Sequence, residues 1–176
     1  MLKNQEIVTK NKPKFGLGSI IFTTIFTIAF IVQIVMMFLI YNELNLTFLV
    51  YIGYIIWIFS LYFSLVPFRI FKKRGDVEKG KSYVYTNKLV NAGPYAIIRH
   101  PQYLGGLLFS ISITLWTQVL LSLILSIIII ILTYQWTYTE DKNLIKKFGE
   151  EYKKYKEKVP RLNPILGIIR YFLGRN

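Results

Sequence analysis

The sequence predicts an all-α integral membrane protein with about four transmembrane helices and with both termini in the cytoplasm. Of its 176 residues, 53% are hydrophobic, which is more than an ordinary soluble domain of this length carries. Three stretches contain no Lys, Arg, Asp or Glu, and each exceeds the roughly 18 residues that mark a transmembrane candidate. They are residues 15–42, 44–68 and 100–139.

The third stretch is long enough for two helices, because one span needs about 20 residues. It breaks naturally at Trp116-Thr117-Gln118. Pro67 marks the end of the second span. We therefore predict spans over 17–41, 46–68, 102–116 and 119–139, of which the third is short.

The basic residues determine the predicted orientation. All 22 Lys and Arg residues fall before Phe15, between Arg69 and Arg99, or after Thr139. The two predicted turns on the other side contain Glu43 and no basic residue. Four spans place the three basic segments on one face, which the positive-inside rule makes cytoplasmic. The net charge of +13 then reflects topology and attraction to anionic lipid headgroups, and it is not a signal for nucleic acid.

The residue types also exclude several kinds of site. The chain contains no cysteine, so we expect no disulfide, no cysteine-ligated metal and no thiol nucleophile. His100 is the single histidine, which makes a poor metal site by itself. The first apolar run is longer than the 7–15 or so residues typical of a signal peptide, and no small-residue cleavage site follows it. We read it as a retained helix.

Four segments describe the predicted organisation. Residues 1–14 form a cytoplasmic tail, and 15–68 form the first two transmembrane helices. Residues 69–164 form a core of a cytoplasmic loop, the third and fourth helices and a C-terminal helix, which together build the pocket. Residues 165–176 form an interfacial tail that is too short to span a membrane. We expect the fourth helix to continue past the membrane surface to about Phe148 and to break at Gly149.

Polar groups converge on the predicted cytoplasmic side. A tight hairpin of the third and fourth helices brings Tyr103 close to Glu140, and so places Arg99-His100 beside Glu140-Asp141. Clustered polar residues at a membrane helix start favour function. Arg99 has structural alternatives, as an ion-pair partner of Glu140 or Asp141 or as a topology anchor. The chain contains no nucleophile elbow, Walker loop or GxGxxG motif.

Two segments of the chain, GPYAIIRHPQYLGG and EDKNLIKKFGEEYKKYKEKVPRLNP, resemble the isoprenylcysteine carboxyl methyltransferase family, which is related to the phospholipid N-methyltransferases. The family pattern is RHPxY, a hydrophobic stretch and a Glu-Glu pair, here Glu140-Asp141. The resemblance covers about residues 86–164. It implies methyl transfer from S-adenosylmethionine to a lipophilic acceptor that enters from the bilayer: an isoprenylcysteine-like carboxylate, a lipid amine or a thiol.

The same resemblance names the site residues. Arg99 and Glu140 are the candidate catalytic residues, and no metal is expected. The expected cofactor contacts are Lys88, Leu89, Val90, Tyr95, His100, Pro101, Gln102, Tyr103, Glu140 and Asp141. Charge pairing suits this set, because Glu140 or Asp141 can bind the amino group of the cofactor and His100 or backbone N–H groups its carboxylate. Tyr95 and Tyr103 can flank the adenine or the sulfonium.

One position departs from the family pattern. The family usually carries an arginine four residues before the first Glu, where it holds the substrate carboxylate, and this chain has Trp136. Unless Arg99 or Arg161 substitutes, Trp136 favours a neutral or apolar acceptor. The alternative function is an NADPH-dependent membrane reductase of the sterol-reductase type, which also carries RHPxY but with Asn at the position of Gln102. A non-enzymatic scaffold leaves the clustered motifs unexplained.

Overall fold

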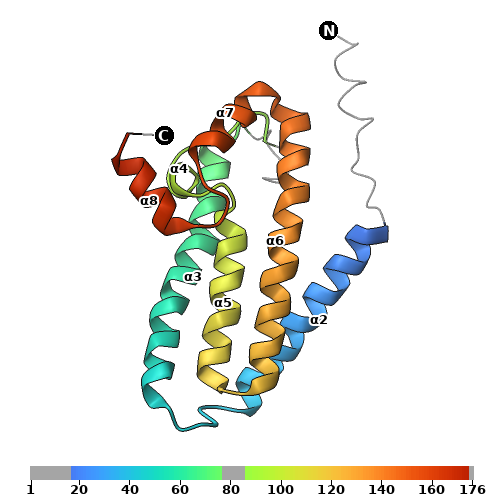
Figure 1. The fold of residues 1–176 in the computed structure, drawn as a ribbon, viewed down its shortest axis with the longest axis vertical. Coiled ribbons are helices and arrows are strands. Elements are labelled where there is room, and N and C mark those ends of the chain that lie inside the picture. Colours follow the sequence, from blue (N-terminus) through green and yellow to red (C-terminus); the bar gives the residue numbers. More distant parts are fainter. Residues whose placement is uncertain (1–16, 77–85, 175–176) are drawn as a thin grey trace.

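The computed structural model describes residues 17–76 and 86–174, and every regular element in these two ranges is a helix (Figure 1). This confirms the predicted all-α class for the described residues, which do not include the predicted tail over 1–14. The helices are α2 (Leu17–Leu39), α3 (Thr47–Arg74), α4 (Pro94–Ile97), α5 (Pro101–Thr117), α6 (Leu120–Phe148), α7 (Glu150–Lys158) and α8 (Pro164–Phe172).

Three of these helices are long and apolar enough to cross a membrane, judged by length and composition: α2 over Ile20–Leu39, α3 and α6. Helix α5, the third predicted span, has 17 residues and is therefore about 25 Å long. That is shorter than the roughly 30 Å of a hydrocarbon core. In Figure 1, α5 lies between α3 and α6. The count of four spans stays a prediction.

The ends of two long helices can be compared with the sequence prediction: one differs from it and one agrees. The prediction that the second helix ends near residue 68 is wrong, because α3 continues to Arg74 with a buried Pro67 inside it. Neighbouring helices make an internal proline tolerable in a membrane helix. Helix α6 runs unbroken to Phe148, as predicted, and ends at Gly149. The φ of Gly149 is 60°, a value that glycine adopts without steric cost.

Close approach and buried hydrogen bonds hold the bundle together. Helix α5 packs against α3 at Gly105, whose carbonyl accepts a hydrogen bond of 2.9 Å from Ser60 Oγ. Helix α2 is tied to the α5–α6 hairpin by Gln33, which is fully buried. Its Nε2 donates to Ser126 Oγ at 3.1 Å, and its Oε1 accepts from Ser110 Oγ at 2.8 Å. These bonds offset the cost of placing polar groups in an apolar bundle.

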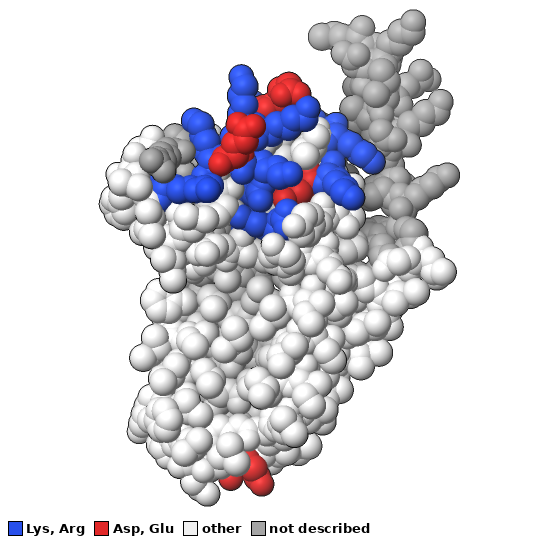
Figure 2. Space-filling view, in the orientation of Figure 1, with Lys and Arg blue, Asp and Glu red and all other residues white. Residues whose placement is uncertain are grey.

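The charged side chains gather at one end of the molecule, as Figure 2 shows. Helices α4, α7 and α8 lie at this end, and the turn between α2 and α3, which carries Glu43, lies at the other (Figure 1). The apolar surface between the two ends is formed by the long helices. Within the described residues, the sorting of charge that the sequence predicts is therefore present in the fold.

Candidate functional site

A cavity of about 370 Å³ opens at the charged end of the bundle. It is formed by the end of α3, the segment over 86–90, the α4–α5 region, the second half of α6 and α7. Its lining comprises Phe71, Thr86, Lys88, Leu89, Val90, Tyr95, Arg99, His100, Pro101, Gln102, Tyr103, Trp136, Glu140, Leu144, Lys147, Phe148, Tyr152 and Tyr155.

The residues that the sequence selects as cofactor contacts meet at this cavity. All of them line it except Asp141, and the two candidate catalytic residues, Arg99 and Glu140, line it as well. The structure thus brings together segments that are about 40 residues apart in the chain, through the hairpin that α5 and α6 form.

The local backbone positions the Arg99-His100 pair. Pro101 begins α5, where its missing N–H leaves no hydrogen bond unmade, and His100 is the residue just before the helix. The backbone N–H of Arg99 donates to the carbonyl of Pro160 at 2.9 Å, and that of His100 donates to the carbonyl of Arg161 at 3.2 Å. The segment after α7 is therefore paired with the start of α5, which brings Arg161 to the site.

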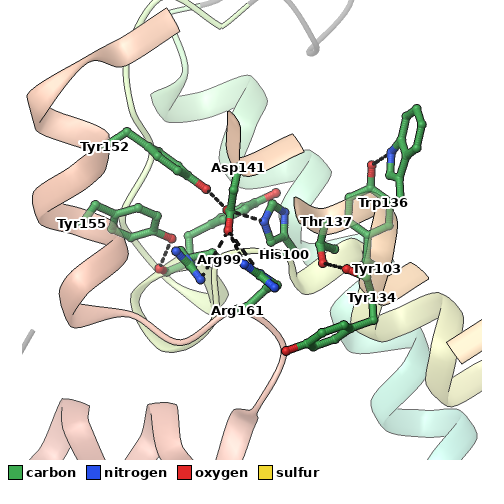
Figure 3. Close-up of polar contacts among 11 residues, drawn as sticks. Arg99, His100, Tyr103, Tyr134, Trp136, Thr137, Asp141, Tyr152, Tyr155 and Arg161 are labelled. Atoms are coloured by element: carbon green, nitrogen blue, oxygen red, sulfur yellow. Dashed lines mark hydrogen bonds and ion pairs between the residues drawn. The ribbon is translucent and has the colours of Figure 1, made fainter. Parts of the chain in front are cut away.

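Asp141 is the centre of a buried polar cluster (Figure 3), whose members Arg99, His100 and Tyr152 also line the cavity. Its Oδ1 lies 2.9 Å from His100 Nε2 and accepts a 2.5 Å hydrogen bond from the Tyr152 hydroxyl. Its Oδ2 accepts two bonds of 3.1 Å from Arg161 and lies 3.5 Å from Arg99 Nη2. Asp141 is only 2% exposed, so this pairing offsets the large cost of burying its charge.

The side chains of Glu140 and Asp141 point to different places, although the two residues are adjacent in the chain. Successive residues of a helix point about 100° apart, so Glu140 faces the cavity while Asp141 faces the cluster. Both carboxylate oxygens of Asp141 are engaged by protein groups, which does not suit the expected contact with a cofactor. His100 Nε2 is likewise engaged by Asp141, and Arg99 takes Asp141 as its ion-pair partner.

The cluster holds more arginine than carboxylate, and of its two arginines Arg99 lines the cavity. Arg99 and Arg161 supply two guanidinium groups, and Asp141 supplies one carboxylate. Arg99 Nε and Nη1 are buried without a hydrogen-bond partner among the described residues, as is Gln102 Nε2. Burial lowers the pKa of the Arg99 guanidinium, while Asp141 opposes that shift. Buried donors of this kind call for an anionic or polar ligand.

Two tyrosines of α7 complete the floor of the cavity. The Tyr155 hydroxyl donates to the carbonyl of Tyr95 at 2.6 Å. Burial raises the pKa of Tyr155, and burial together with the bond to Asp141 raises the pKa of Tyr152. Both phenols therefore stay protonated at neutral pH and act as donors.

Trp136 forms an aromatic rim one helical turn before Glu140, toward the apolar span. Its Nε1 donates to the Tyr103 hydroxyl at 2.9 Å. Its ring stacks on Phe22 of α2 with centroids 4.5 Å apart and planes 10° from parallel. Arg161 is held elsewhere, because its guanidinium lies 3.5 Å from the ring centre of Tyr138 as well as on Asp141. It is not a free clamp for a substrate.

Several lining residues were not among the expected catalytic residues or cofactor contacts: Phe71, Thr86, Trp136, Leu144, Lys147, Phe148, Tyr152 and Tyr155. Helical spacing from Glu140 could have found four of them, since Trp136, Leu144, Lys147 and Phe148 lie four, seven or eight positions away on the same helix. Phe71 has no such signal, because it comes from α3.

The described residues contain no group of three or more His, Cys, Asp or Glu side chains that could hold a metal ion. Comparison with protein families finds one matching model, described as phospholipid methyltransferase, over residues 48–151. That range is more than half of the chain.

Curated relatives carry the name protein-S-isoprenylcysteine O-methyltransferase. The Mus musculus and Homo sapiens proteins are each 38% identical over 87 residues, which is 46% of this chain and 29% of theirs. The Schizosaccharomyces pombe protein is 34% identical over 83 residues, 44% of this chain and 34% of its own length. The match therefore spans about a third of these relatives. No solved structure matches the chain.

Proposed function

Because this chain belongs to the phospholipid methyltransferase family, we propose that it transfers the methyl group of S-adenosylmethionine to a lipophilic acceptor at the membrane surface. One observation carries the proposal: a single cavity presents the cationic Arg99 and the anionic Glu140. The amino-acid end of S-adenosylmethionine bears a carboxylate and an amino group, which these two side chains complement.

The cavity residues fit this cofactor. A volume of about 370 Å³ lies within the range of roughly 300–1,000 Å³ that small-molecule sites occupy. The unpaired nitrogens of Arg99 and Gln102 are donors for the cofactor carboxylate, and the Glu140 carboxylate accepts from its amino group. Tyr95, Tyr103 and Phe148 offer aromatic faces to the adenine and the sulfonium.

The chemistry then depends mainly on positioning. When bound, the cofactor supplies an electrophilic methyl group on a positive sulfur. Glu140 and Arg99 hold the amino-acid end at the α6 and α5 sides of the cavity, and the aromatic lining excludes water from the remainder. Holding both reactants in line supplies most of the rate enhancement in such a displacement. Asp141 serves as a positioning residue, because it fixes His100 and Arg99.

The rim of the cavity favours a neutral acceptor. Trp136 and Tyr103 lie at the side nearest the apolar span and are bonded to each other. In Figure 3, Arg99 and Trp136 lie on opposite sides of His100, so Arg99 serves the cofactor end. Arg161 is held by Asp141. Of the three acceptor classes, a lipid amine or a thiol therefore suits the rim better than an isoprenylcysteine-like carboxylate.

The proposed topology places the cavity at the cytoplasmic face. The distribution of Lys and Arg supports four spans with both termini in the cytoplasm. A short α5 suits this arrangement if the membrane is locally thin beside it. Since the chain contains no cysteine, single cysteines placed at residues 43 and 142 test it with a membrane-impermeant thiol reagent in sealed cells. We expect labelling from outside at 43 alone.

Calorimetry on the purified protein in detergent tests the cofactor. We expect heat on addition of S-adenosylmethionine and none with NADPH. Heat with NADPH alone would overturn the proposal in favour of the reductase.

Methyl-labelled cofactor identifies the acceptor. Membranes that contain the protein are incubated with it, and the label is followed into lipid, protein or a small thioether. Membranes that carry the Glu140→Gln variant supply the background. Label that enters none of the three fractions above this background would contradict methyl transfer.

A further inference from the structure

Helix α8 presents an apolar surface that the other described residues leave exposed. Its nine residues are about 14 Å long, too short to span a membrane. Gly167 is buried against the carbonyl of Ile97, where a side chain would overlap. The apolar side chains around it are at least 38% exposed: Ile165, Leu166, Ile168, Ile169, Tyr171, Phe172 and Leu173. A patch of this kind marks a membrane or partner contact.

A second cavity, of about 420 Å³, lies between α7, α8 and the segment over 89–96. Its lining comprises Leu89, Asn91, Ala96, Glu151, Lys154, Tyr155, Lys158, Val159 and Tyr171. Lys154 and Lys158 are four residues apart and so lie on one face of α7. Glu151 offsets one of these charges. Arg170 adds another cation beside them, since its Nη1 donates to the carbonyls of Glu157 and Lys158 at 3.2 Å each.

We propose that this cavity binds the anionic headgroup of a membrane phospholipid whose acyl chains lie along α8. The lysine ammonium groups, the Asn91 amide and the Tyr171 hydroxyl are donors that suit a phosphate. Tyr171 joins the two features, because it lines the cavity and also belongs to the exposed surface of α8. A lipid satisfies both the cationic cavity and the apolar face, whereas a free phosphate satisfies only the first.

The bound lipid lies behind a wall of the first cavity. Leu89 and Tyr155 line both cavities, and the Tyr155 hydroxyl is bonded to the backbone of Tyr95. The inference concerns binding alone and does not depend on the proposed methyl transfer, so failure of one leaves the other standing.

Native mass spectrometry of the protein in detergent tests the site. Phosphatidylglycerol and phosphatidylcholine are added in turn, and we expect one phosphatidylglycerol to be retained in preference. The double variant Lys154→Gln/Lys158→Gln should weaken its retention by about thirtyfold, because each lysine near an anionic headgroup contributes to binding. The matched control, Lys142→Gln/Lys146→Gln, has the same spacing and charge change on α6 outside both linings, and it should retain the lipid.

A second variant tests the apolar half of the site. Phe172 is 82% exposed, so Phe172→Gln leaves the fold intact and should weaken retention of phosphatidylglycerol. Equal loss of lipid in the α6 control would overturn the proposal, since it would indicate general attraction to positive charge. Complete displacement of the lipid by an equal concentration of glycerol phosphate would also overturn it, because the site would then take free phosphate.

Discussion

His100 Nε2 lies 2.9 Å from Asp141 Oδ1, and this contact joins the residue before α5 to the second half of α6 beside the cavity. Arg99, Tyr152 and Arg161 share the same carboxylate. One aspartate thereby links the Arg99-His100 turn, α6, α7 and the segment after α7. The cavity walls depend on this cluster for their position, so changes to Asp141 and to its neighbour Glu140 should have different consequences.

Asp141→Asn should destabilise the protein. Removing one partner of a buried ion pair typically costs about 3–5 kcal/mol, because the two guanidinium groups would lose their counter-charge. Thermal unfolding in detergent, followed by circular dichroism, should show a fall of roughly 10 °C. Glu140→Gln is the control, since it makes the same kind of change one residue earlier at a half-buried side chain. An unchanged unfolding temperature in Asp141→Asn would contradict the assigned role.

Glu140→Gln should weaken binding of S-adenosylmethionine while leaving the fold intact. A hydrogen bond to a charged group contributes about 1.5–3 kcal/mol, so titration calorimetry should show a loss of affinity of roughly tenfold to a hundredfold. The control is Glu150→Gln, an exposed carboxylate paired with Lys153 outside both cavities. Wild-type affinity in Glu140→Gln would show that the amino group is held elsewhere.

The buried tyrosines predict a dependence of stability on pH. The pKa values of Tyr152 and Tyr155 are raised, first by burial. Above a pH of about 10 the unfolded chain releases phenolic protons that the folded protein keeps, so the free energy of unfolding falls as pH rises. This contribution is complete below pH 10 and decreases by about 1.4 kcal/mol per pH unit for each tyrosine above it.

Comparison with Tyr152→Phe/Tyr155→Phe isolates this effect. Between pH 9 and about pH 11, the wild-type unfolding temperature should fall more steeply than that of the double variant, whatever their difference at pH 8. Parallel curves for the two proteins would show that neither phenol is perturbed.

Gly105→Ala should separate α3 from α5. A Cβ at this position would lie 2.8 Å from the backbone nitrogen of Ser64 and closer still to its Oγ, so the helices would have to move apart at a cost of about 1–3 kcal/mol. Gly106→Ala is the matched control, because nothing lies within 4 Å of the added atom and alanine favours the helix. The unfolding temperature of Gly106→Ala should equal or exceed that of the wild type, and the unfolding temperature of Gly105→Ala should be lower. The reverse order would contradict the close packing.

The sequence by itself determined the helices and the sorting of charge. Runs without charge over 15–42, 44–68 and 100–139 lead to α2, α3 and the α5–α6 hairpin, because apolar length and the break at Gln118 are local properties. The RHPxY resemblance also selected residues that line the cavity, among them Gln102 and Tyr103. These signals lie in contiguous segments and can be read without knowing the packing.

Only the tertiary structure decided the separate roles of Glu140 and Asp141. The direction in which each side chain points depends on the phase of α6 relative to α5 and α7, which no local pattern encodes. Packing likewise brought Arg161 to Asp141 across 20 residues and set Phe22 of α2 on Trp136. Burial decides these roles. A carboxylate at a cavity wall can bind a ligand, whereas a carboxylate that helix packing removes from water serves as the counter-charge of two arginines.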